Sequence, residues 1–539
     1  MLSAYICAFL LLFTGYDCNW VPKEHQSTNY SINSCRFARE YNTDDVYTSL
    51  NKREELMNTI SYWEGKFYVH DIGYNAVSGL TYDGHGIEFE SGLKHDPKHP
   101  FSASSKESLH LNILTLALQG DKNALSFFTT TAEQDGMKHF GTKDVKQIIL
   151  QTLQRKINSY KKFNEKYPGF GGFLPWFMVT DDGASLLWDW LDRVPSLDNG
   201  QLVWSMIACI QVLKDTDNYN LASQYEEHVE LMKHSAWLIF YESEGRIRTV
   251  ANIKNVTSSV ERSNYESPFC NSPPCYLDDP YEGELMIFFF ELYANTHTWS
   301  SSDKEAIWNY KREKLQSVDF VTPKGNITVE RGWWFSSHEK WKYLNLPYRS
   351  VEINKRLFIN GEKARTWYSY MNNIPGMFAS VTSPTRTGSY DPGYLSACGI
   401  QSISFETVQH TDVVTPYGAY PVILASPQHG LSWYLTMLKG SRMQGPFGST
   451  EASFTDGTGI SPVVTWDSKV TTVVAMLGGV SDITEKVLRK QGKYERFYNL
   501  VNKEWSSKFT SIRGEDIPFA LPSSQLPCKD PCDFSTCSK

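Results

Sequence analysis

The sequence predicts a mainly α-helical fold in which helical hairpins form an (α/α) toroid, with long loops and short β elements lining a cleft at one face. Seven segments carry apolar residues at every third and fourth position, which is the spacing of an amphipathic helix. Strand signals are short and scattered, without the regular alternation with helices that a parallel α/β barrel requires. Long loops rich in glycine, proline and aromatic residues separate the helices, and such loops are usually functional.

The predicted elements follow one another over most of the chain. The predicted helices span residues 46–63, 109–118, 145–163, 202–213, 222–239, 285–294 and 487–505. Short strands are predicted at 67–70, 246–250 and 326–329, and long loops at 167–176 and 382–396. No composition shift marks a linker before about Pro518. We therefore expect a signal peptide at 1–16, an N-terminal extension at 17–45, one large domain at 46–517 and a Cys-, Pro- and Ser-rich tail at 518–539.

Composition excludes several classes of protein. The 539 residues include 52 Lys and Arg against 60 Asp and Glu, a net charge of -8, so the surplus of cations that nucleic-acid binding needs is missing. With 21% charged and 41% hydrophobic residues, the chain resembles neither a disordered protein nor a multispanning membrane protein. The unusual feature is the aromatic content of 16 Trp, 30 Tyr and 29 Phe.

The N-terminal residues and the cysteines indicate an oxidising compartment. The apolar run at 4–13 is too short to span a bilayer and is typical of a signal peptide, the alternative being a short buried segment. We expect a secreted protein without a membrane span, or else one retained in the ER lumen or an endo-lysosomal compartment. Cys209 lies in an apolar run and is predicted to be a buried free thiol. Loop cysteines suited to disulfides are Cys18, Cys35, Cys270, Cys275, Cys528, Cys532 and Cys537, and glycosylation sequons begin at Asn29, Asn255 and Asn326.

Several common catalytic signatures are missing. There is no G-x-S-x-G elbow, no phosphate loop and no H-E-x-x-H motif, because the sequence after His338 lacks the second histidine. The tail cysteines have no histidine near them, so a disulfide is favoured over a zinc site. We predict neither a metal nor a cofactor.

One candidate for acid chemistry lies where the helix at 285–294 begins. Asp279 and Pro280 suit the N-cap and N1 positions, and Glu282 then completes a capping box, which gives Glu282 a structural role. Glu284 directly precedes an apolar run, so partial burial would raise the pKa of its carboxyl toward that of a general acid. The positive helix end opposes this shift, and a salt-bridged structural carboxylate is the alternative.

The second candidate is the acidic segment at 445–469. Asp467 precedes an apolar helical run, and Asp456 is followed by glycine. The local alternatives are a helix N-cap for Asp467 and a turn for Asp456. Paired carboxylates together with exposed aromatic rings are the equipment of a glycosidase, in which one acid protonates the leaving oxygen and a second carboxylate activates water.

Aromatic residues are concentrated at 331–343 and 186–193, mixed with charged residues. Such a mixture is too polar for a buried strand and indicates a cleft lining, with a core-packing cluster as the alternative. Asp198 and Asn199 stand just before a helix, where capping and ligand contact are equally consistent with the sequence.

Taken together, four segments resemble the eukaryotic endo-β-1,2-glucanases of glycoside hydrolase family 162, with a fainter similarity to the bacterial enzymes of family 144. The segments are Ser196-Leu-Asp-Asn-Gly200, Asp278-Asp-Pro-Tyr-Glu-Gly-Glu284, Arg331-Gly-Trp-Trp334, and Gly448-Ser-Thr-Glu451 with Pro462-Val-Val-Thr-Trp-Asp-Ser-Lys469. The resemblance covers about 46–505 and implies an (α/α)6 toroid of six helical hairpins. It also implies anomer-inverting hydrolysis inside β-1,2-glucan, with a Glu acid and an Asp base that acts on water through a substrate hydroxyl.

Carried onto this chain, the resemblance makes Glu284 the acid, with Glu282 as its rival, and Asp467 the base, with Asp456 in reserve. The substrate-binding residues expected from these segments and from the aromatic cluster at 331–343 are Asp198, Asn199, Arg331, Trp333, Trp334, Tyr343, Glu451, Trp466 and Lys469. The partner is then a β-glucan oligo- or polysaccharide, while the oligomeric state is left open. The sequence leaves two alternative functions open. The first is a glycosidase or phosphorylase acting on another β-glucan, and the second is a carbohydrate-binding protein that has lost catalysis.

Overall fold

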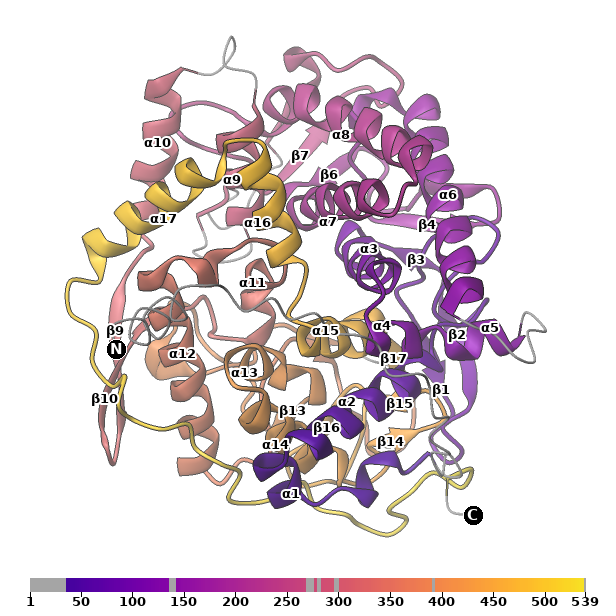
Figure 1. Ribbon diagram of the computed structural model, residues 1–539, viewed down its shortest axis with the longest axis vertical. Helices are drawn as coiled ribbons and strands as arrows, with labels where there is room; N and C mark the ends of the chain where they lie inside the picture. The colour runs from indigo at the N-terminus through magenta and orange to yellow at the C-terminus, as the bar shows by residue number, and fades with distance from the viewer. Residues whose placement is uncertain are drawn as a thin grey trace, which may run out of the picture. The chain divides into compact units, whose positions relative to one another are not determined.

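The computed structural model describes residues 35–134, 142–267, 276–278, 283–294, 300–389 and 393–537 (Figure 1). Several expectations from the sequence fall outside these ranges. They are the signal peptide at 1–16, most of the extension at 17–45, the sequon at Asn29, the cap at Asp279 and Pro280, Glu282, and the cysteines Cys18, Cys270 and Cys275.

Helices dominate the described residues, and seven of them contact one another in a ring (Figure 1). In ring order they are α3 (Ser104–Gln119), α7 (Ser196–Asp215), α9 (Glu284–Tyr293), α17 (Tyr494–Lys508), α12 (Glu352–Met371), α13 (Tyr420–Ala425) and α15 (Trp466–Met476), which returns to α3. Helices that pack against members of this ring are α2 (Leu50–Gly65), α6 (Thr142–Lys166), α8 (Tyr219–Phe240), α14 (Pro427–Leu438) and α16 (Ser481–Lys490). The other helices are α1 (Thr43–Thr48), α4 (Lys122–Phe127), α5 (Thr129–Gln134), α10 (Ser301–Arg312) and α11 (Lys342–Asn345), of which α4 also contacts α3, and α11 contacts α7 and α9.

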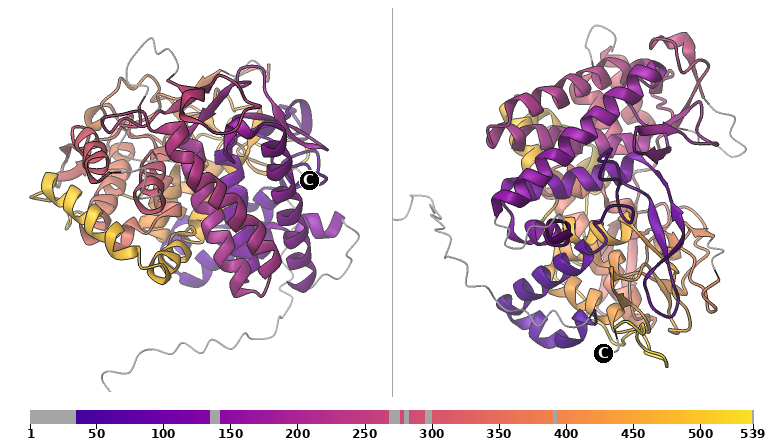
Figure 2. Two further views of the ribbon diagram at one scale, coloured as in Figure 1. Left: turned by 90° about the horizontal axis from the view of Figure 1, so that it is seen from above. Right: turned by 90° about the vertical axis from the view of Figure 1, so that its right-hand side faces the viewer.

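Burial separates the two layers of helices. The helix α3 buries its side chains continuously from Ser104 to Leu118, and α7 does so from Asn199 to Leu213. Helices that are buried all round belong to the centre of a fold, whereas α16, which packs against α7 from outside the ring, buries one stripe. In Figure 2 the long helices α6 and α8 lie side by side, and both contact the buried helices. This two-layer arrangement is that of an α/α toroid.

The strands are short and pair antiparallel throughout the described ranges. The three-stranded sheets are β17 (Val463–Thr465) with β1 (Gly84–Ile87) and β2 (Lys94–His99), β3 (Phe101–Ser102) with β4 (Phe177–Thr180) and β5 (Gly183–Leu186), and β6 (Arg193–Pro195) with β7 (Val250–Ile253) and β8 (Tyr265–Glu266). The two-stranded ones are β9 (Ser317–Thr322) with β10 (Gly325–Glu330), β11 (Val381–Thr382) with β12 (Tyr394–Leu395), β13 (Val413–Val414) with β16 (Ser453–Phe454), and β14 (Gln444–Gly445) with β15 (Gly448–Ser449).

Three of these strands lead directly into buried helices. The strand β3 ends two residues before α3, while β6 and β17 run without a gap into α7 and α15. The three sheets therefore hold the N-terminal turns of α3, α7 and α15, and the register of β1 on β17 places His85 opposite Val464. Residues of these first turns are consequently brought to one region of the fold.

The predicted helices are found, with two corrections. The helix predicted at 46–63 is divided at Ser49, which caps α2 by accepting a hydrogen bond from the Lys52 amide, and the one at 487–505 is divided at Gly492, whose φ is +66°. The strand at 326–329 is confirmed by β10. In contrast, 67–70 forms a turn and bend that end in an isolated bridge at His70, and within 246–250 only Val250 belongs to a strand, β7, while Ile247 and Arg248 make isolated bridges. Helices α4, α5, α10, α11, α12, α13 and α14 were not predicted.

Among the described residues, one disulfide ties the C-terminal tail to the rest of the chain and another lies within the tail. Cys35 pairs with Cys537, 502 residues away, and Cys528 pairs with Cys532. Cys209 is a buried free thiol, as predicted, and Cys398 is another. Residues 34–539 form one compact unit. None of the described helices is long and apolar enough to cross a membrane.

Candidate active site

Asp467 occupies the second position of α15, and it does not cap the helix. The N-cap is Thr465, whose hydroxyl accepts a hydrogen bond from the Ser468 amide in a capping box. The N-cap interpretation of Asp467 was therefore wrong, and its carboxyl group is available for other contacts. Lys106 Nζ of α3 lies 3.0 Å from Asp467 Oδ2 and 3.6 Å from Asp83 Oδ1.

The Asp467 carboxyl is nearly buried but keeps an unused acceptor. Its side chain is 13% exposed, and Oδ1 has no hydrogen-bond partner among the described residues. Burial raises the pKa of Asp467, while the Lys106 ammonium opposes this and the nearby Asp83 carboxylate adds to it. A carboxylate with raised basicity and a free lone pair is equipped to take a proton from a bound hydroxyl or water.

Two more groups complete this cluster from neighbouring elements. Trp176 Nε1 donates to Asp198 Oδ2 over 3.2 Å, and the Lys106 ammonium lies 5.2 Å from the Trp176 ring centroid. Burial raises the pKa of Asp198, whereas Lys106 lowers it. Asp198 stands in the first turn of α7. The first turns of α3, α7 and α15 thus converge on one group of charges, and Asp198, which the sequence analysis named as a substrate-binding candidate, belongs to this group.

A row of aromatic rings extends from the cluster. His99 Nδ1 contacts Asp83 Oδ2 at 3.1 Å. The rings of His99, Phe101, Trp176 and Trp190 follow at successive centroid separations of 5.4, 6.0 and 6.4 Å. Trp188, in the same loop as Trp190, is 66% exposed. The core-packing alternative for the segment 186–193 therefore does not hold for Trp188.

Glu451 brings a third carboxyl group near Asp467. It is 3% exposed, its Oε1 accepts a hydrogen bond of 2.7 Å from the Thr382 amide, and its Oε2 has no partner in the described part of the chain. Burial raises the pKa of Glu451 to about 7, and the Asp467 carboxylate contributes to the rise. Glu451 therefore exchanges its proton near neutral pH.

Glu284 is the first residue of α9 and has no exposed surface. Its Oε2 accepts hydrogen bonds from Lys342 Nζ at 2.9 Å and from Tyr348 Oη at 2.5 Å, and Lys311 Nζ lies 3.5 Å from Oε1. Burial raises the pKa of Glu284, the direction expected from the sequence, although both lysines lower it. These contacts match the salt-bridged structural alternative.

The segment 331–334 lies near the residues that precede α9. Lys314 Nζ is 3.4 Å from Asp278 Oδ2 and 5.7 Å from the Trp333 ring centroid. Arg331 donates to the carbonyl of Ser404, and the amides of Trp333 and Trp334 donate to the Glu339 carboxylate. The rings of Trp333 and Trp334 are half-buried, which leaves part of each surface available to a ligand.

Four predicted substrate-binding residues belong to the protein interior. Asn199 is fully buried, and its amide makes four hydrogen bonds, to Ser104, Leu174 and Pro195. The three others are equally buried: Tyr343 donates to Asn354, Trp466 to the Gly73 carbonyl, and Lys469 pairs with Glu64 at 3.1 Å. Their donors and acceptors are used within the protein, so a structural role replaces the expected contact with substrate.

Asp456, the reserve base, lies in a turn. Its Oδ1 accepts hydrogen bonds from the amide and hydroxyl of Thr458, and its side chain is 53% exposed. The hydrogen bonds from Thr458 lower its pKa. The turn interpretation is thus the one its contacts favour. Sequence reasoning missed Lys106 and Asp83, for which no local motif exists, and passed over Trp176 at the end of a loop already singled out.

The chain is similar to a known protein family over most of its length. A family model described as endo-beta-1,2-glucanase SGL, of glycoside hydrolase family 162, matches residues 80–538. Comparison with the curated proteins gives no match.

Solved structures give the same result. An endo-beta-1,2-glucanase from Talaromyces funiculosus, in complex with sophorose, is 40% identical, with a TM-score of 0.87 over 94% of this chain and 100% of its own. A Glu→Gln variant of that enzyme in complex with beta-1,2-glucan matches equally well. An endo-beta-1,2-glucanase from Chitinophaga pinensis is 12% identical, with a TM-score of 0.54 over 85% of this chain and 98% of its own. The last comparison bears on the fold alone, and the prediction of an (α/α)6 toroid is confirmed.

Proposed function

This chain belongs to the endo-β-1,2-glucanase SGL family, glycoside hydrolase family 162, and from that membership we propose that it hydrolyses β-1,2-glucan at internal linkages. The observation that carries the proposal at the level of chemistry is the Asp467 carboxylate, which is held by Lys106 and keeps a free acceptor. It lies where the N-terminal turns of three buried helices converge, next to aromatic rings.

Asp467 is the general base in this proposal. Its raised pKa makes it a stronger proton acceptor than an exposed aspartate, and the Lys106 ammonium favours the ionised form that a base needs. In an inverting glycosidase the base activates water on the face of the sugar opposite the leaving group. The resemblance noted in the sequence adds that the proton passes through a substrate hydroxyl.

The general acid is one of two glutamates, Glu282 and Glu284. An acid must carry a proton before the reaction and must come within hydrogen-bond reach of the glycosidic oxygen. Glu284 has no exposed surface and is ion-paired with two lysines, whose charges oppose the rise in its pKa that burial causes. These contacts favour Glu282, the rival, as the acid. Glu282 lies outside the described residues, so its assignment rests on the sequence and on elimination.

The aromatic row gives the substrate a path away from the reacting centre. Sugar rings present C–H faces that pack on aromatic faces, and Trp188 and Trp190 offer such faces in one exposed loop. Binding that extends on both sides of the cleaved bond is what internal cleavage requires. We assign Trp188 and Trp190 to the binding of glucose units remote from the cleaved linkage.

Secretion is part of the proposal. The pairs Cys35–Cys537 and Cys528–Cys532 are typical of proteins that fold in an oxidising compartment, and the sequon residue Asn255 is exposed. The ER lumen and endo-lysosomal compartments are the alternatives. Treatment of the protein secreted by expressing cells with a glycosidase that removes N-linked sugars tests this point, because a shift in mass requires passage through the secretory route.

One assay separates the proposed activity from its alternatives. The purified protein is incubated with β-1,2-, β-1,3- and β-1,4-glucans, with and without inorganic phosphate, and new reducing ends are measured. We expect cleavage of the β-1,2-glucan alone, independent of phosphate. A requirement for phosphate indicates a phosphorylase. Cleavage of β-1,3- or β-1,4-glucan indicates a glycosidase that is specific for another linkage, and binding without cleavage indicates a carbohydrate-binding protein.

A further inference from the structure

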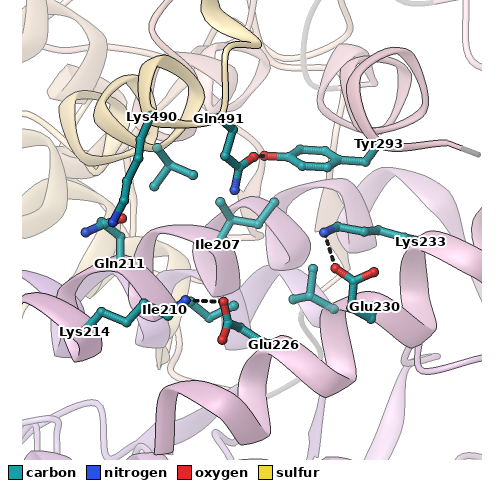
Figure 3. Close-up of a pocket in the computed structure, with 12 residues that line it drawn as sticks. Ile207, Ile210, Gln211, Lys214, Glu226, Glu230, Lys233, Tyr293, Lys490 and Gln491 are labelled. Carbon is teal, nitrogen blue, oxygen red and sulfur yellow. Dashed lines mark hydrogen bonds and ion pairs between the residues drawn. The ribbon is translucent and has the colours of Figure 1, made fainter. Parts of the chain in front are cut away.

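A groove lies at the ends of α7 and α9 that are remote from the proposed active site. One part of it, about 330 Å³ in volume, lies between α7, α8 and α16, and an adjoining part of about 950 Å³ reaches α10 and α17. Figure 3 shows Tyr293 reaching Gln491 across the groove, with a hydrogen bond of 2.7 Å, and Lys233 pointing toward Glu230. Tyr293 is nine residues after Glu284 on α9, which is about 14 Å along the helix axis.

Cations gather around the ring of Tyr293. The ammonium groups of Lys233 and Lys493 each lie 4.7 Å from its ring centroid. Lys304 and Arg496 line the same part of the groove. These four cations come from α8, α10 and the start and body of α17, so three separate elements contribute positive charge to one place.

Only part of this charge is neutralised. Lys233 pairs with Glu230 at 2.6 Å, and Arg496 pairs with Glu291. Within the described ranges, Lys304 and Lys493 have no carboxylate within ion-pair distance, and they donate to the carbonyls of Glu291 and Leu292 at the end of α9. A carbonyl accepts a hydrogen bond but carries no net charge, so the four cations of this part of the groove face two carboxylates, those of Glu230 and Glu291. Each ammonium also has three N–H donors, of which the carbonyl contact uses one.

The lysines repel one another. Burial lowers the pKa of Lys493, and the charges of Lys233 and Lys304 lower it further. Burial likewise lowers the pKa of Lys304, where Glu291 opposes the effect and Arg496 adds to it. An anion placed between these groups would remove the repulsion and accept their spare N–H donors, because a charge-assisted hydrogen bond is among the stronger polar contacts.

We propose that this groove binds a tetrahedral oxyanion of the phosphate or sulfate class, held by Lys233, Lys304 and Lys493 beside Tyr293. The site is independent of glucan hydrolysis, since it lies at the C-terminal ends of α7 and α9, whereas Asp198 stands in the first turn of α7. The oxyanion bridges α8, α10 and the start of α17, which meet around the last turn of α9. Binding therefore stabilises the fold and leaves the chemistry at Asp467 unchanged.

Calorimetric titration of the full chain with inorganic phosphate, at constant ionic strength, tests the proposal. We expect the Kd to rise by about tenfold or more in the double variant Lys304→Gln/Lys493→Gln. The matched control is Lys486→Gln/Lys503→Gln, in which both lysines are exposed and lie near the carboxylates of Asp215 and Glu305. Its Kd should equal that of the wild type. Equal affinity in all three proteins, or no binding to the wild type, would overturn the proposal.

A second measurement does not depend on the folding of the variant. For the wild-type protein, phosphate should raise the Tm by roughly 1 to 3 °C above sodium chloride of the same ionic strength. An equal Tm in both salts contradicts a specific site. Repeating the titration with a phosphate monoester distinguishes two ligands, the free inorganic ion and a phosphate group carried by a larger molecule. Activity on β-1,2-glucan should be the same in the wild type and the lysine variants, so failure here leaves the proposed function untouched.

Discussion

Lys106 Nζ lies 3.0 Å from Asp467 Oδ2, and this ion pair joins the first turns of α3 and α15, which are 361 residues apart in the sequence. The pair fixes the position of the proposed base and sets its charge state. The free Oδ1 of the same carboxyl is the acceptor that catalysis requires.

Lys106→Met removes the charge beside Asp467 and keeps the length of the side chain. Because Lys106 lowers the pKa of Asp467, its loss should raise that pKa and shift the acid limb of the kcat/KM profile to higher pH. The profile is measured across the acidic and neutral range. Lys94→Met, which removes an exposed lysine paired with Asp71, is the control, and an unshifted limb in Lys106→Met would refute the role of the pair.

Glu284→Gln and Glu282→Gln separate the two acid candidates. If Glu284 is structural, its replacement removes the buried carboxylate that both Lys342 and Lys311 face, and stability should fall by about 3 to 5 kcal/mol. Glu282→Gln should instead lower kcat by about 100- to 10,000-fold with an unchanged Tm. Urea unfolding and initial rates provide both values. An active Glu282→Gln beside an inactive, stable Glu284→Gln would return the acid role to Glu284.

Glu451→Gln tests the raised pKa of the buried Glu451 carboxyl, through the pH dependence of the free energy of unfolding. The pKa of about 7 lies above the ordinary value of 4.5, so the folded state holds a proton that the unfolded state has lost between those pH values. Stability of the wild type should therefore decline as pH rises from 4.5 through 7. The glutamine variant lacks this decline and should gain up to about 3 kcal/mol relative to wild type above pH 7. Parallel stability curves for the two proteins would rule out the raised pKa.

Trp188→Ala and Trp190→Ala probe the exposed aromatic loop. Loss of one stacking surface costs about 1 kcal/mol, so KM for long β-1,2-glucan should rise by about fivefold with little change in kcat. Short oligosaccharides that do not reach the loop should be unaffected. Tyr219→Ala, at the start of α8 and 61% exposed, controls for the loss of an exposed ring. Equal KM changes for long and short substrates would contradict the assignment.

Helical periodicity, which is a local property of the chain, was enough to predict a helical fold, and the order of motifs along the chain carried the resemblance that implied the six-hairpin toroid. The ion pair of Lys106 with Asp467 could not be predicted, since no local pattern links residues so far apart. The capping of α15 was missed because Asp467 is also a good N-cap residue, and only the structure shows that Thr465 takes that place.

The late motif shows why a segment does not identify its functional side chains. On a helix, Trp466 and Lys469 are separated by 300° of rotation and so lie within 60° of each other, while Asp467 is 100° from Trp466 in the other direction. Trp466 and Lys469 share the face that packs into the core, and Asp467 points toward α3. The sequence contained the whole motif, but it did not show which of these side chains pack into the core and which one points toward α3.

The central claim is internal cleavage of β-1,2-glucan by a centre built on Asp467. It is tested most directly by the size distribution of products from long linear β-1,2-glucan at low conversion, for the wild type and for Asp467→Asn, with Asp456→Asn as the control. We expect the wild type and Asp456→Asn to release a range of mid-length oligosaccharides, and Asp467→Asn to release none within the detection limit. Release of glucose or a single short product alone, or full activity of Asp467→Asn, would contradict the account.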